Sequence, residues 1–162
     1  MPTANIVELC QAVADALNAA DVGTFEETFT AEFIFAPEYS VMDAKTLRVI
    51  VTDAGGDLEM IARSRLGFTD NVRVVILWRV DAAGTGLDAT KIGRGLTLLE
   101  EISRFLVGKK MADYNQTGTA RRADGEKEKN HYMPGNLQER TFAAALVLPY
   151  VTTENLTRET SS

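Results

Sequence analysis

Two segments of the chain repeat apolar residues at the spacing of an α-helix. Residues 5–19 begin with Thr3 or Asn5 as a candidate N-cap, and Glu8 follows Asn5 at the spacing of a capping box. Their apolar side chains share one helical face: Ile6, Leu9, Cys10, Val13, Ala14 and Leu17. In residues 89–107 the same spacing unites Ile92, Leu96, Leu99, Ile102, Phe105 and Leu106. We therefore predict two amphipathic helices.

Four other segments have the patterns of β-strands. Residues 25–39 and 46–52 alternate apolar and polar positions, and Pro37 ends the first of them. Residues 72–80 form a third strand pattern. Residues 141–151 are almost continuously apolar, which is typical of a strand covered on both faces.

Residues 58–68 fit either a helix or a strand, because both spacings unite apolar side chains there. We favour the strand, since Asp70-Asn71 can make the turn of a hairpin that leads into residues 72–80. A further turn is expected at Asp53-Ala54-Gly55-Gly56-Asp57.

The element order is therefore α-β-β-β-β-α-β. It predicts an α+β fold, with a single mixed β-sheet of about four to five strands and two helices packed on it. Residues 1–152 are expected to form one domain, and residues 153–162 a flexible tail. The residues expected in the core are Leu9, Val13, Phe33, Val49, Val74, Ile76, Leu99, Ile102 and Leu146.

A long polar arm, residues 109–139, separates the second helix from the last strand. Loops beyond about 12–15 residues are uncommon in compact domains and are often functional, and this segment is about twice that length. Residues 109–140 carry seven Lys or Arg and five Asp or Glu, whereas the rest of the chain carries ten and eighteen. We interpret the arm as an assembly arm, and expect residues 111–136 to become ordered on assembly.

Composition excludes several classes of function. The net charge of −6 argues against general nucleic-acid affinity, which normally needs a basic face. The single cysteine cannot form an internal disulfide, which fits a cytosolic compartment. The first residues lack the pattern of a signal peptide, and no apolar run approaches the 18 or so residues of a membrane-spanning helix.

Little in the sequence indicates catalysis. Residues 84–89 match G-x-G-x-x-A between a strand and a helix, but no second parallel strand is expected about 20 residues further on, so a flexible turn is favoured.

His131, the only histidine, has no neighbouring partners for base or metal chemistry. Cys10 lies on the apolar face of the first helix. The acidic pairs, such as Asp57 and Glu59, are interpreted as solvated faces, the alternative being an acidic surface that matters collectively. We expect no enzyme activity, cofactor or metal.

The order and spacing of these elements resemble the tail terminator and neck proteins of tailed bacteriophages. The resemblance covers about residues 4–152. It rests on the segments Ile6–Ala19, Phe29–Phe33, Leu47–Val51, Ser64-Arg65, Val72–Leu77, Leu99–Ile102 and Leu148–Tyr150. It implies a small α+β domain without catalysis, whose copies form a ring, commonly a hexamer.

In that family the ring caps the completed tail tube and joins it to the head connector. The resemblance thus implies a virion protein assembled in the host cytoplasm, with partners that are copies of itself, the tail tube protein and connector or adaptor proteins. DNA would pass through the lumen without specific binding, and no membrane is involved. The alternatives are a head-completion or connector-adaptor protein, or a small soluble ligand-binding domain or enzyme.

The assembly interface is expected in the arm and on the charged strand faces, where an acidic partner or another copy could be steered. The residues predicted to form it are Arg63, Arg65, Arg121, Arg122, Lys127, Lys129, His131 and Tyr132.

Overall fold

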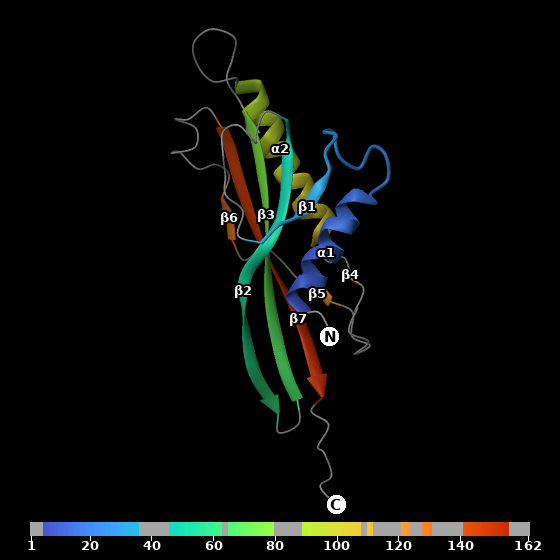
Figure 1. Ribbon diagram of the computed structural model, residues 1–162, viewed down its shortest axis with the longest axis vertical. Coiled ribbons are helices and arrows are strands. Elements are labelled where there is room, and N and C mark those ends of the chain that lie inside the picture. Colours follow the sequence, from blue (N-terminus) through green and yellow to red (C-terminus); the bar gives the residue numbers. More distant parts are fainter. Residues whose placement is uncertain are drawn as a thin grey trace, which may run out of the picture.

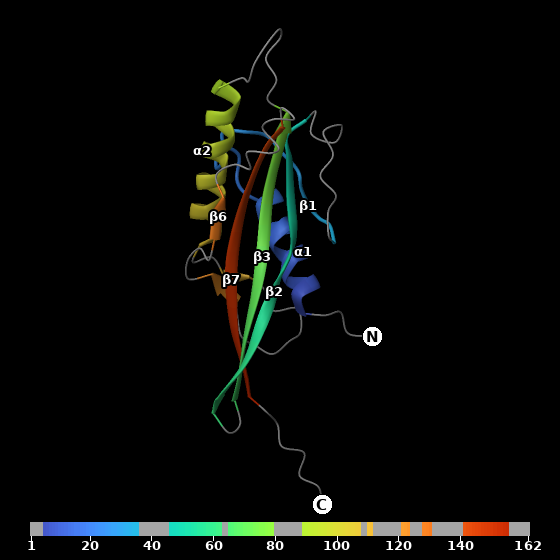
Figure 2. The same cartoon turned by 90° about the vertical axis from the view of Figure 1, so that its left-hand side faces the viewer.

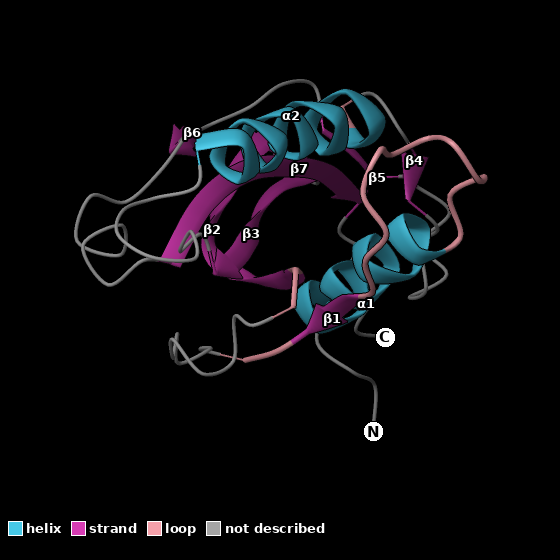
Figure 3. Ribbon diagram, turned by 90° about the horizontal axis from the view of Figure 1, so that it is seen from above, coloured by secondary structure: helices cyan, strands magenta, loops and turns pink. Residues whose placement is uncertain are grey.

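A single mixed β-sheet with two helices on one face forms the core of the protein (Figures 1 and 3). The computed structural model describes residues 5–35, 46–62, 65–79, 89–107, 110–111, 121–123, 128–130 and 141–155. The predicted α+β class is confirmed. Its elements are α1 (Asn5–Asn18), β1 (Ala31–Phe33), β2 (Arg48–Ala62), β3 (Arg65–Arg79), α2 (Ala89–Leu106), β4 (Lys110–Met111), β5 (Arg121–Ala123), β6 (Glu128–Asn130) and β7 (Thr141–Asn155).

Three long antiparallel strands, β2, β3 and β7, form the body of the sheet. The strand order is β1-β2-β3-β7-β5-β4, and β6 also pairs with β7. The sheet is mixed because β1 runs parallel to β2. As its apolar run predicted, β7 is an interior strand, and residues 142–148 are buried on both faces.

Both helices bury their apolar stripes against the same face of the sheet, where alternate residues of β2, β3 and β7 meet them. Helix α1 contacts β1 and β2, while α2 lies over β7. Gly95 allows α2 to approach closely, because a Cβ there would lie 2.5 Å from a ring atom of Phe142. The predicted core is confirmed: eight of its nine residues are buried, and Phe33 packs against the cluster while partly exposed.

The prediction of a strand over residues 25–39 is wrong for most of its length. The only strand within residues 25–35 is β1, and residues 36–45 lie outside the described part. The aromatic residues at the start of this segment pack on a helix instead. Phe25 contacts Phe29 and Phe105 of α2, with ring centroids 5.2 and 5.4 Å apart. These contacts hold residues 25–29 against a helix rather than in the sheet.

The turn predicted at residues 53–57 is also wrong, since β2 continues through it. The two glycines lie at an irregularity within β2, where the register against β3 shifts between Asp53 and Gly56. Gly55 has a φ of 89°, and its amide donates a 2.8 Å hydrogen bond to Asp53 Oδ1. This local turn bends the strand without reversing it.

The predicted hairpin exists, but its position was wrong. Asp70 and Asn71 lie within β3, and the chain reverses between Ala62 and Arg65. Residues 58–68 therefore divide between two strands, and the helical alternative for them is excluded. Strand β3 pairs on both edges at Asp70, with Gly56 and Tyr150, so ladder hydrogen bonds outweigh a local turn preference.

The described parts of the polar arm are strands of the same sheet. β4, β5 and β6 lie at its edge, which adds three short strands to the predicted four or five. Strand β7 extends to Asn155, so residues 153–155 of the predicted tail are also paired with β3.

Candidate functional site

The end of the sheet at which β2 turns into β3 and β7 finishes extends past both helices (Figures 1 and 2). This extension consists of residues 57–62 of β2, 65–69 of β3 and 151–155 of β7, which pair throughout except for a register shift between Met60 and Ala62. A three-stranded ribbon that reaches beyond its own core presents backbone edges to other molecules, which makes it a candidate contact surface.

One edge of this surface is the outer edge of β2. Strand β3 occupies the inner edge along the whole strand, and β1 pairs with the outer edge only at residues 49–51. Within the described residues no strand pairs with the outer edge over residues 53–62. At about 3.3 Å per residue this edge is roughly 30 Å long.

The opposite edge of the sheet is formed by pieces of the arm. Strand β3 pairs with β7 from Thr141 to Asn155, so β5 and β6 occupy the other edge of β7. The structure thereby brings the predicted residues Arg121, Arg122 and Lys129 to one side of the sheet. Together β4, β5 and β6 carry four basic residues and one acidic residue.

Sequence reasoning did not single out Lys110 as an interface residue. In the structure Lys110 begins β4 and pairs with Arg122. The surplus of basic residues in the arm was a signal for this edge, but the sequence does not show which of them become neighbours.

The other predicted interface residues are not gathered here. Arg65 begins β3 at the far end of the extension, where its partners in the ladder are Ala62 and Asn155. Arg63, Lys127, His131 and Tyr132 lie outside the described residues.

The sequence did not predict that Asp53 lies on the same strand as the acidic pair Asp57 and Glu59. Residues 53–62 contain three carboxylates and no basic residue, and all three lie on the strand whose outer edge is open in the described part: Asp53, Asp57 and Glu59. The sequence analysis placed Asp53 and Asp57 in a turn and Glu59 in the following strand, so it did not predict that all three lie on one strand.

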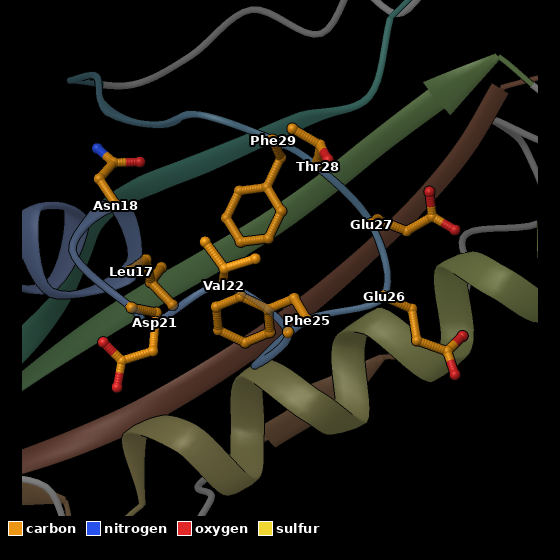
Figure 4. Close-up of a pocket in the computed structure, with 11 residues that line it drawn as sticks. Leu17, Asn18, Asp21, Val22, Phe25, Glu26, Glu27, Thr28 and Phe29 are labelled. Atoms are coloured by element: carbon orange, nitrogen blue, oxygen red, sulfur yellow. The ribbon is translucent and has the colours of Figure 1, made fainter.

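A hollow of about 380 Å³ lies beside the end of α1, formed with the segment that leads to β1 (Figure 4). Leu17, Phe25 and Phe29 face one another across it, while Val22 in its lining is fully exposed to solvent and Asp21 and Glu26 point away from the apolar centre. The lining contains no histidine, cysteine or basic side chain. It offers a small apolar contact with an acidic rim rather than a catalytic arrangement.

The segment that lines this hollow is tied to α2 by charged contacts. Arg94 donates two hydrogen bonds, of 2.6 and 2.8 Å, to the carboxylate of Glu27. The amide of Glu26 donates to Glu101 Oε2 at 3.1 Å. The Arg94 guanidinium also lies 5.1 Å from the ring centre of Trp78. Glu27 is therefore part of a structural clamp, which leaves it unsuited to base chemistry.

Cys10 lies on the inward face of α1 and is fully buried, as its position on the apolar face predicted. Burial, followed by the carboxylates of Asp53 and Asp70, raises the pKa of its thiol to about 12. Burial, and then the neighbouring Cys10, raises the pKa of the Tyr150 hydroxyl as well. A nucleophilic cysteine needs a lowered pKa and access to solvent, so Cys10 is a packing residue.

Ionisation of Cys10 should destabilise the protein at alkaline pH. Below the ordinary thiol pKa of 9.0 both states are protonated, and between pH 9 and about 12 only the unfolded state ionises. The free energy of unfolding should therefore fall by about 4 kcal/mol across this range. Urea unfolding at pH 8, 9.5 and 10.5 measures the first part of this fall, about 2 kcal/mol. Cys10→Ala should show a shallower decline, carried by Tyr150 above pH 10, and equal declines would contradict the assignment.

The described strands next to β3 do not form the parallel unit that the G-x-G-x-x-A motif requires. Residues 84–88 lie outside the described part, and Ala89 begins α2. A dinucleotide site needs a parallel strand after the helix, whereas β7 runs antiparallel to β3. The described residues contain no group of three His, Cys, Asp or Glu that could hold a metal ion.

Neither described helix is both long enough and apolar enough to cross a membrane.

Comparison with known proteins does not assign the chain to a family. No protein-family model matches the sequence, and no curated protein matches it either.

Proposed function

We propose that this chain is a structural protein of a tailed bacteriophage, a tail terminator whose copies form a ring, six being the expected number. The ring would cap the completed tail tube and join it to the head connector. The observation that carries the proposal is the extension, a paired ribbon of β2, β3 and β7 beyond the helices. The resemblance of the sequence to terminator and neck proteins supplies the biological setting.

The division of the molecule fits such a role. Its upper part has a buried core of helices and sheet that can fold in each copy before assembly. The extension and the arm strands then offer backbone and charge to neighbouring copies. The net charge of −6 suits a ring around a DNA path, because an acidic lumen repels phosphate and lets DNA pass.

Purified protein and a phage lacking the gene together test this proposal. Size-exclusion chromatography with light scattering, followed by electron microscopy of negatively stained particles, should show rings alone or on the ends of tail tubes. Deletion of the gene should give tails of uncontrolled length that do not join heads. Tails of normal length that stay unattached would instead indicate a connector-adaptor protein, and infectious virions would exclude both roles.

A further inference from the structure

The two edges of the sheet carry opposite charge, which restricts how copies can meet. The acidic edge, residues 53–62 of β2, carries three acidic residues. The basic edge, formed by β4, β5 and β6, has a net charge of +3 from four basic residues and one acidic residue. Like edges repel each other, so two copies cannot associate through the same edge, whereas unlike edges attract.

The register places three of these charged residues, Asp57, Arg122 and Lys110, in one row across the sheet. Asp57 pairs with Thr69, and Thr69 with Val151. Val151 pairs with Arg122, and Arg122 with Lys110. The row thus begins with an acidic residue on β2 and ends with two basic residues, on β5 and β4. A second copy placed in line with it brings its Asp57 beside Lys110 of the first.

On this basis, and resting on the proposed function, we propose that copies of this chain join head to tail. The acidic edge of one copy lies against the basic edge of the next. The contact is heterologous, because it uses two different surfaces, and such contacts close into rings when the rotation between copies permits. Charge placed along an edge strand also disfavours pairing with any chain that lacks the complementary charge.

Charge reversal at each edge tests the proposal. Asp57→Lys with Glu59→Lys reverses the acidic edge, and Lys110→Glu with Arg122→Glu reverses the basic edge. Each pair of substitutions places like charges together and should weaken self-association about a hundredfold or more. Both pairs combined in one chain restore attraction and should recover rings. Sedimentation and light scattering at low salt measure association, and circular dichroism verifies folding.

Two further sets of variants make the result specific. Asp15→Lys with Glu100→Lys changes the net charge by the same amount on exposed helix positions, and should leave association unchanged. The neutral substitutions Asp57→Asn and Glu59→Gln should give a smaller loss, which also covers the case in which the reversed variant does not fold. An equal mixture of the two single-edge variants should associate, since each supplies the edge that complements the other.

The outcomes separate this inference from the proposed function. If the wild type forms rings and the single-edge reversals leave them intact, the edges are not the contact, although a ring-forming role remains. If the reversals leave rings intact but prevent their binding to tail tubes, the occupant of the edge is the tube protein, which overturns the inference. If the wild type forms no rings, either alone or with tail tubes, the proposed function fails and the inference fails with it.

Discussion

Substitution of Leu99 by alanine should lower the free energy of unfolding by about 2–5 kcal/mol. Leu99 is completely buried in the layer between α2 and the sheet. The change removes apolar contacts and leaves a cavity that close-packed neighbours fill only in part. For a domain of this size the melting temperature should fall by roughly 5–15 °C, measurable by calorimetry or by circular dichroism.

Thr97→Ala is the matched control for this experiment. Thr97 lies on the same helix but is exposed, and its hydroxyl donates only to the Gly93 carbonyl one turn earlier. Its substitution should change stability by no more than about 0.5 kcal/mol. An unchanged melting temperature for Leu99→Ala would show that α2 does not pack on the sheet as described.

Replacement of Gly56 by alanine should destabilise the extension by about 1–3 kcal/mol. A Cβ at this position would lie 2.6 Å from the Thr69 carbonyl oxygen and 3.0 Å from Asp70 Oδ1. The first of these is a backbone atom of the paired strand, so β2 and β3 must separate or lose their register. Hydrogen exchange of the amides of residues 65–69 would report this loosening directly.

The same substitution also tests whether the extension, rather than the core, carries the contacts between copies. If the extension carries the contacts between copies, Gly56→Ala should weaken ring formation even at temperatures where the protein remains folded. Gly93→Ala is the control, because a Cβ there meets no atom within 4 Å. It should stabilise α2 by up to about 1 kcal/mol and leave assembly unaffected. Normal exchange and normal rings in Gly56→Ala would contradict the close approach.

Local periodicity was sufficient to predict both helices, their buried faces and the interior position of the last strand. Helices α1 and α2 end within one residue of the expected positions, because the 3.6-residue repeat of their apolar side chains is a local property. The continuous apolar run of β7 likewise predicts that this strand is buried, and it is a local property of the sequence. The basic balance of the arm was also readable, since it depends only on composition.

Pairing and register were decided by the tertiary structure. Asp70-Asn71 has the composition of a turn, yet β3 runs through it because neighbouring strands occupy both of its edges. The glycines at 55 and 56 indicated a turn but form an irregularity within β2, where Gly56 lies against the backbone of β3. Turn preferences are weak compared with a ladder of hydrogen bonds, so local sequence could not place these features.

The candidate contact surface depends on such pairing. Asp57, Arg122 and Lys110 are far apart in the sequence, and no periodicity connects them. They enter one row only because β3 and β7 stand between them in register. The sequence by itself determined which segments are apolar and which are charged, because these are properties of single residues and their spacing. Only the folded sheet decided that the acidic and basic residues lie on opposite edges, because strand order is set by long-range hydrogen bonding and burial.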